Sequence, residues 1–174
     1  MDALARTEAK VIAAITIKPP PLYPAIDHAV WRPTDVGEWQ AVVRALVHRY
    51  SVERPIVTHW EIGNEPDLGE GGGSPYRILD PADYAAYYEM TARAVLEAFP
   101  QAKVGGPASA VGAWIVQFLQ RVKESGAKID FVTWHWYNCG YDVADYASQI
   151  ATVRRTLAEL GFGDEIELAY SEWN

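Results

Sequence analysis

The sequence has little cysteine, no long apolar run and fewer basic than acidic residues. Its one cysteine, Cys139, excludes an internal disulfide and any CxxC metal or redox motif. The longest apolar stretch, 11–17, has the length of a strand and falls short of the about 20 residues of a membrane span, so no membrane partner is expected. The 15 basic and 23 acidic residues give a net charge of −8, which argues against a nucleic-acid partner.

The first ten residues also lack the apolar segment of a signal peptide. The location is therefore left open, and a cytoplasmic one is expected if the chain is complete. The 174 residues suffice for one domain, expected over 1–174, and are too few for two ordinary ones. With 49% apolar and 22% charged residues, the composition is typical of a globular protein.

Short apolar runs alternate with longer stretches of helical periodicity. The expected strands cover 11–17, 56–65, 103–106, 129–137 and 165–172. The expected helices cover 35–50, 80–99, 114–126 and 143–160. Such alternation predicts an α/β fold with a parallel sheet and right-handed crossovers. Both an open doubly wound sheet and part of a (β/α)8 barrel satisfy this pattern, whereas a whole barrel of such units does not fit in the chain.

Two glutamates lie at the carboxyl ends of expected strands, where a parallel α/β fold binds its ligands. Glu65 lies in the stretch WEIGNEPD, and Glu172 lies in LAYSEWN. Three strand–helix units separate them. One glutamate at a strand end is usually only solvated, but two of them, each beside Asn or Trp, indicate a chemical site.

Asn64-Glu65-Pro66 after an apolar strand resembles the acid/base signature of the clan of retaining glycoside hydrolases that fold as (β/α)8 barrels. In that clan the Asn-Glu pair ends barrel strand four and the nucleophilic Glu ends strand seven, which is the separation found here. The sequence is most similar to glycoside hydrolase family 39, which includes β-xylosidases and α-L-iduronidases. Gly63 departs from the bulky residue expected there, which leaves other families of the clan open. The similar stretches are 39–50, 60–68, 104–108, 130–137 and 172–174.

The resemblance implies a retaining glycosidase, or the catalytic fragment of one, with a carbohydrate substrate and no cofactor. Glu65 would be the general acid and then the general base, and Glu172 the nucleophile. Asn64 would bind the sugar 2-hydroxyl. Tyr137 would donate a hydrogen bond to Glu172, and His135 would lie just below the two carboxylates and orient them.

Aromatic residues are abundant, with seven Trp and ten Tyr, and such side chains either fill a core or line a sugar-binding cleft. Three tryptophans on expected helices or in mid-strand are predicted to be core: Trp39, Trp60 and Trp114. The other four are predicted to stack on sugar rings: Trp31, Trp134, Trp136 and Trp173.

Other interpretations of the same residues remain open. Under two-residue alternation His59 and Glu61 share the face of Glu65, and they are expected to form a buried polar pair. With His135 they mimic a metal site, although no HExxH or Cys/His spacing supports one. The glycine-rich segment 71–77 is either a lid or a solvated loop. A catalytically inactive carbohydrate-binding piece and a metal-dependent hydrolase are the alternative functions.

Within the clan, the expected strands correspond to barrel strands three to seven. The expected fold is therefore a partial (β/α)8 barrel of five parallel strands and four helices, with two bare sheet edges and an apolar inner face of Val, Ile and Trp. Bare edges favour pairing with another chain. The chain is thus expected to be a fragment of a longer enzyme or to form a homo-oligomer through its sheet edges, and to have weak or no activity alone.

Overall fold

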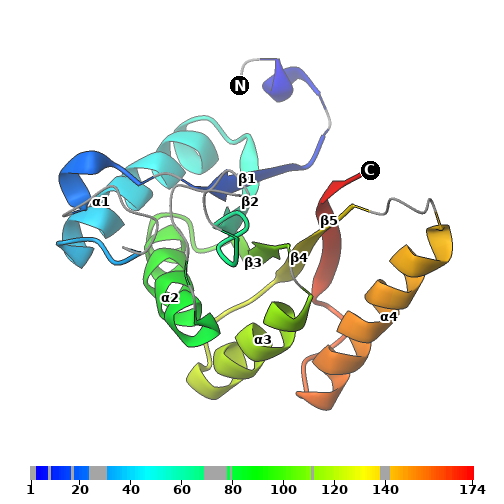
Figure 1. The fold of residues 1–174 in the computed structure, drawn as a ribbon. Helices are drawn as coiled ribbons and strands as arrows, with labels where there is room; N and C mark the ends of the chain where they lie inside the picture. Colours follow the sequence, from blue (N-terminus) through cyan, green and yellow to red (C-terminus); the bar gives the residue numbers. More distant parts are fainter. Residues whose placement is uncertain are drawn as a thin grey trace.

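The computed structural model describes residues 3–7, 9–16, 18–23, 31–68, 78, 80–110, 112–137 and 142–174. The predicted lid segment 71–77 and Cys139 lie outside the described residues. Within the described residues, five strands alternate with four α-helices (Figure 1). The strands are β1 (Val11–Ile15), β2 (Val57–Ile62), β3 (Lys103–Ser109), β4 (Phe131–Trp136) and β5 (Glu167–Trp173). The helices are α1 (Val36–Val47), α2 (Pro81–Ala98), α3 (Ala113–Ser125) and α4 (Val143–Glu159).

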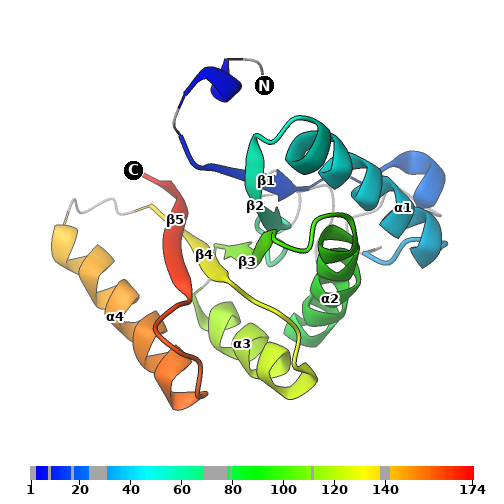
Figure 2. The same ribbon diagram turned by 180° about the vertical axis from the view of Figure 1, so that it is seen from behind.

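All five strands are parallel and pair in chain order, β1-β2-β3-β4-β5. Helices α1 to α4 follow one another in an arc on one side of this sheet (Figures 1 and 2). The unbroken chain order distinguishes a half-barrel from an open doubly wound sheet, in which the strand order reverses at a switch point. The expected partial (β/α)8 barrel is therefore confirmed. None of the helices in the described part combines the length and apolarity needed to cross a bilayer.

Local signals in the sequence account for the helix ends. The side chain of Asp80 caps α2 by accepting a hydrogen bond from the Ala82 amide at 2.7 Å, and Pro81 follows as the first helical residue. Helix α3 ends at Gly126, whose φ of 71° suits glycine. The predicted helix 35–50 ends earlier, at Val47, and continues as a π-helical stretch over His48–Glu53.

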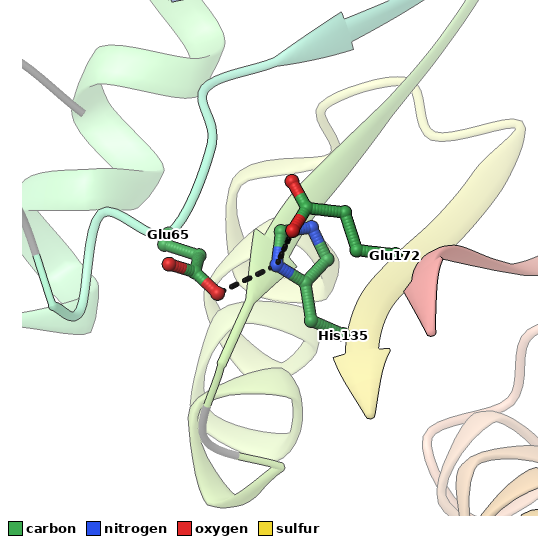
Figure 3. Close-up of side chains that lie close together, drawn as sticks. All are labelled: Glu65, His135 and Glu172. Carbon is green, nitrogen blue, oxygen red and sulfur yellow. Dashed lines mark hydrogen bonds and ion pairs between the residues drawn. The ribbon is translucent and has the colours of Figure 1, made fainter. Parts of the chain in front are cut away.

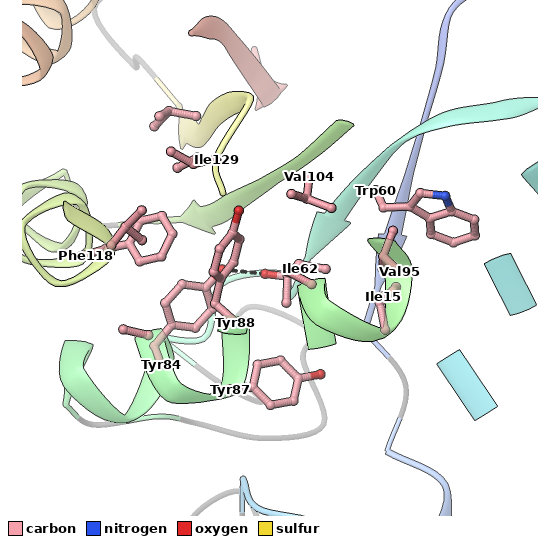
Figure 4. Packing of buried hydrophobic residues seen from close by; sticks show 14 of the residues in the cluster. Ile15, Trp60, Ile62, Tyr84, Tyr87, Tyr88, Val95, Val104, Phe118 and Ile129 are labelled. Carbon is pink, nitrogen blue, oxygen red and sulfur yellow. Dashed lines mark hydrogen bonds between the residues drawn. The ribbon is translucent and has the colours of Figure 1, made fainter. Parts of the chain in front are cut away.

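The apolar core lies between the sheet and the helices (Figure 4). On the helix side, the Phe118 ring of α3 packs edge-on against Tyr84 and Tyr88 of α2, with centroids 5.1 and 5.0 Å apart. Trp39 and Trp60 are both buried, as predicted. Trp114 is partly buried and packs against the same core.

The other face of the sheet is largely polar, so the predicted apolar inner face is wrong. It carries these buried residues, each alternating along its strand with core residues: His59, Glu61, Thr133 and His135. Successive side chains on a strand point to opposite faces. The core residues Trp60, Ile62, Val132 and Trp134 therefore fill the helix side. The inner side holds the polar groups together with the Phe131 ring, whose centroid lies 5.6 Å from that of His59.

Near the amino ends of the strands, this inner face holds an ionic cluster around Glu167 of β5. Lys103 of β3 bonds one oxygen of its carboxylate, and Nε2 of His59 lies 3.3 Å from the other. Lys10, just before β1, lies 3.9 Å away. Burial lowers the pKa of His59, and the Glu167 charge opposes that shift. The cluster thus joins β2, β3, β5 and the residue before β1 at the end of the sheet opposite Glu65 and Glu172.

Strand β3 has two glycines because its neighbours approach it closely. A Cβ at Gly105 would lie 2.2 Å from the Phe131 carbonyl oxygen. A Cβ at Gly106 would lie 2.5 Å from the Tyr84 hydroxyl, which donates a hydrogen bond to the Ile62 carbonyl at 2.6 Å. The Gly-Gly pair therefore lets α2 anchor the end of β2, the strand that leads to Glu65.

We expect Gly105→Ala to lower the free energy of unfolding by about 3 kcal/mol, because the added methyl meets backbone rather than a flexible side chain. Gly112→Ala is the matched control, since no atom lies within 4 Å of a Cβ built there. We expect that control to change the free energy of unfolding by less than about 1 kcal/mol. Urea denaturation of the two variants measures both, and equal losses would contradict the packing described for β3.

Candidate active site

His135, on β4, lies between the two glutamates identified in the sequence (Figure 3). Its Nδ1 atom lies 2.7 Å from Oε1 of Glu65 and 3.6 Å from Oε2 of Glu172. The imidazole is 2% exposed. A buried imidazole in hydrogen-bond contact with one carboxylate and in ionic contact with a second fixes the position of both.

Glu65 follows β2 in a short turn instead of ending the strand, which stops at Ile62. Its backbone has a φ of 41°, in the left-handed region that few residues other than glycine adopt. This conformation is held by the Glu65 amide, which donates to the Ala108 carbonyl at 2.8 Å. Two residues later, the Asp67 side chain accepts a hydrogen bond from the Ala110 amide at 3.1 Å. Strand β3 thus fixes the Glu65 turn, and Glu65 itself is 7% exposed.

Glu172 reaches the site through an irregularity in β5. Trp134 pairs with Tyr170, but the next residue, His135, pairs with Glu172, which leaves Ser171 as an extra residue. Such a bulge changes the direction of the side chains that follow it. The Glu172 side chain is 41% exposed, so the nucleophile candidate is accessible while Glu65 is buried.

Tyr137 follows β4 and donates its hydroxyl to Oε2 of Glu172 at 2.6 Å. This hydrogen bond raises the pKa of the Tyr137 phenol, because losing the proton would put a second negative charge beside the carboxylate. The hydroxyl therefore acts as a hydrogen-bond donor to the Glu172 carboxylate. The ring is 53% exposed.

The two carboxylates are close enough to act on one bond. One oxygen of each, together with the His135 nitrogen, lie within 4.8 Å of one another. The same three atoms could contact a metal ion, and they differ from the set His59, Glu61 and His135 considered in the sequence. The hydrogen bond between Nδ1 of His135 and Oε1 of Glu65 already uses the nitrogen that lies nearest to both carboxylates. The arrangement therefore suits acid–base and nucleophilic chemistry better.

A third carboxyl, Glu61, lies on the inner face of β2. It is 4% exposed, and burial raises its pKa. The hydroxyls of Thr133 and Ser171 and the charge of His135 oppose that shift, and the charge of Glu172 adds to it. The expected polar pair of His59 and Glu61 is thus two groups with separate partners, since His59 faces Glu167 instead.

Of the four tryptophans predicted to stack on sugar rings, the structure contradicts the prediction for Trp134. Trp134 is buried, with its indole nitrogen donating to Gln149 of α4, so that prediction is wrong. Trp136, on the same side, shares a hollow with Ile115 and Val153. The other two lie on the helix side as well: Trp173 beside Tyr146 and Tyr170, and Trp31 beside Val36 and Met90. Two-residue alternation with His135 already indicated this side for Trp134 and Trp136.

Asn64 is half-buried in the turn before Glu65, next to the candidate acid. Thr133, which the sequence analysis missed, accepts from the Ala108 amide at 3.1 Å and so supports the strand segment that holds Glu65. The sequence does contain a signal for this role of Thr133. A polar residue recurs at every second position along this segment: Thr133, His135 and Tyr137.

Comparison with known proteins identifies the family of this chain. The family model "Glycosyl hydrolases family 39" matches residues 26–167. The chain belongs to this family. A β-xylosidase from Geobacillus stearothermophilus is 35% identical over 111 residues, which are 60% of this chain and 21% of that protein. A β-xylosidase from Caldicellulosiruptor saccharolyticus is 28% identical over 109 residues and is covered to 22%. This family 39 chain thus spans about a fifth of the length of these relatives.

Solved structures agree with both the fold and the family. A GH39 β-xylosidase from Caulobacter crescentus is 32% identical, with a TM-score of 0.68, over 86% of this chain and 31% of that one. A glucosidase from Croceicoccus marinus is 28% identical, with a TM-score of 0.77, over 96% of this chain and 35% of that one. A family 44 endoglucanase from Clostridium thermocellum, at 15% identity and a TM-score of 0.59, shares the fold.

The Tyr137–Glu172 hydrogen bond can be measured without a substrate. We expect Tyr137 to ionise above the usual pKa of 10.0, because its proton is shared with a carboxylate. Glu172→Gln removes the charge and should lower the Tyr137 pKa toward that value. Carbon NMR of ring-labelled tyrosine, with Tyr137→Phe to assign the signal, measures the titration. An unchanged pKa in Glu172→Gln would show that the two groups do not interact in solution.

Proposed function

We propose that this chain carries the catalytic carboxylates of a retaining glycosidase that cleaves β-xylosides. The observation that supports it most is the Glu65–His135–Glu172 arrangement. One oxygen of each carboxylate and one nitrogen of the imidazole lie within 4.8 Å of one another. Retaining enzymes place their carboxyl groups about 5–5.5 Å apart, whereas inverting enzymes leave about 6.5–9.5 Å for a water molecule. The short separation favours retention.

In the first step, the Glu172 carboxylate attacks the anomeric carbon and forms a glycosyl ester. The bond to the leaving-group oxygen breaks at the same time, and protonated Glu65 gives its proton to that oxygen. In the second step, water attacks the anomeric carbon, its proton passes to Glu65, and Glu172 leaves as a carboxylate. Both residues return to their starting states.

The surrounding contacts fit these roles. Tyr137 donates a hydrogen bond to Glu172 and so helps to hold the carboxylate that attacks. His135 touches both carboxylates and limits their movement between the two steps. Asn64, adjacent to the candidate acid, would hydrogen-bond the sugar 2-hydroxyl, a contact that strengthens as positive charge develops on the ring.

The choice of β-xylosides rests on two curated relatives and a solved GH39 structure that are named β-xylosidases. The solved structure named a glucosidase makes β-glucosides the second substrate to test. Aryl β-xyloside and aryl β-glucoside hydrolysis should be compared on this chain and, where its gene encodes more, on the whole product. Turnover of neither glycoside by either protein would contradict the proposed activity.

Glu65→Gln tests the acid role. We expect it to reduce kcat about 10²–10⁴-fold on alkyl β-xylosides, whose leaving groups need a proton. The reduction in the glycosylation rate should be much smaller for dinitrophenyl β-xyloside, because that phenolate leaves without one. Kinetics on both substrates measure the difference.

Glu165→Gln is the matched control, because Glu165 is an exposed glutamate outside the site. It should leave both rates unchanged. Equal losses in Glu65→Gln on good and poor leaving groups would contradict a general-acid role for Glu65.

A further inference from the structure

Beneath the two proposed catalytic carboxylates, the buried Glu61 carboxyl extends from β2 across β3. It can do so because β3 presents Gly105, paired directly with Glu61, which has no side chain to block it. The carboxyl reaches Thr133 on β4 and faces Ser171 on β5. One side chain thus joins the three strands that carry Glu65, His135 and Glu172 or lead to them.

The hydrogen bonds of Thr133 link Glu61 to the backbone of Glu65. The Thr133 oxygen accepts from the Ala108 amide at 3.1 Å, which leaves its single hydroxyl proton for the Glu61 carboxyl. The Ala108 carbonyl in turn accepts from the Glu65 amide at 2.8 Å. On the other side, Ser171 is the extra residue of the bulge that directs Glu172 into the site.

We propose that Glu61 is a positioning residue for both carboxylates and that it performs this role in its protonated form. The inference rests on the proposed function for the catalytic role of Glu65 and Glu172. The contacts of Glu61 do not depend on that function. Glu61 faces the His135 imidazole of β4 and the Glu172 carboxylate of β5, and its charge also acts on the Tyr84 hydroxyl of α2 on the helix side of the sheet. A negative charge on Glu61 would be buried and would lie close to the Glu172 carboxylate, and both effects disfavour it.

Two unpaired atoms support the protonated form. Oε1 of Glu61 and Nε2 of His135 are buried and have no hydrogen-bond partner in the described part of the chain. When Nδ1 of His135 carries its hydrogen toward Glu65, Nε2 is an acceptor, and an ionised Glu61 adds another acceptor. A proton on Glu61 supplies a second free donor here, beside the Ser171 hydroxyl, whose Oγ is also buried without a hydrogen-bond partner in the described part.

Stability as a function of pH tests the protonation state without any substrate. Burial raises the pKa of Glu61 above 4.5, so between that pH and its folded pKa the folded protein keeps a proton that the unfolded chain loses. Wild-type stability then falls as pH rises, and Glu61→Gln avoids this loss. We expect the melting temperature of Glu61→Gln to rise relative to wild type from about pH 4 to about pH 7. A constant difference would overturn the protonated form.

The Tyr137 titration reports the position of Glu172 and tests the positioning role. Glu61→Gln and Glu61→Ala both remove the charge, but only Gln keeps an oxygen for Thr133. We expect Glu61→Gln to retain the raised Tyr137 pKa and Glu61→Ala to lose it. Thr133→Val should also lose the raised Tyr137 pKa. It replaces Glu61→Ala in the test if circular dichroism shows that the alanine variant is unfolded. The same Tyr137 pKa in all variants would overturn the positioning role.

Xyloside kinetics then separate the two proposals. We expect Glu61→Gln to keep kcat within threefold of wild type and Glu61→Ala to lose at least tenfold in kcat, with KM within threefold for both, since Glu61 does not contact the sugar. Unchanged kcat in Glu61→Ala would overturn the positioning role. If wild-type protein turns over no glycoside while the stability and Tyr137 results are as expected, the proposed function fails and the assignment of Glu61 stands.

Discussion

The contact of His135 with two carboxylates from different strands is the interaction on which the site depends. A hydrogen bond of 2.7 Å to Glu65 and an ionic contact of 3.6 Å to Glu172 bring together residues 107 positions apart in the sequence. The contact is possible because parallel strands end at one edge of the sheet. Since the imidazole is buried, its polar contacts are poorly screened by water, and small movements of either carboxylate are opposed more strongly than they would be at the surface.

Two local departures from regular structure direct the carboxylates toward this imidazole. Glu65 adopts a left-handed backbone conformation after β2, and β5 has an extra residue before Glu172. Each is stabilised by the adjacent strand, through the Ala108 carbonyl and through the pairing of His135 with Glu172. Strain and bulges of this kind concentrate at functional sites, where the surrounding structure compensates for them. Gly105 and Gly106 of β3 leave space for the neighbours that support these departures, β4 and the Tyr84 hydroxyl of α2.

Much of the fold could be predicted from the sequence because its signals are local: the alternation of strand and helix, the Asp80-Pro81 start of α2 and the glycine ends of α3 and α4. The polar inner face could not be predicted from composition, because it depends on which of two alternating series faces the helices. The bulge in β5 depends on its pairing with β4, so no segment read alone contains it. The directions of Trp134 and Trp136 were predictable from their alternation with His135, and the aromatic-cleft interpretation overlooked this.

Covalent labelling tests the central claim most directly. A 2-deoxy-2-fluoro-β-xyloside with a good leaving group should form a stable ester on the nucleophile, because the fluorine slows the hydrolysis of that ester more than its formation. Peptide mass spectrometry of this chain and, where its gene encodes more, of the whole product should find one added fluoroxylosyl group on Glu172 and none in Glu172→Gln. Labelling of another carboxylate, or a product with inverted anomeric configuration, would contradict the assignment of Glu172 and Glu65 as a retaining pair.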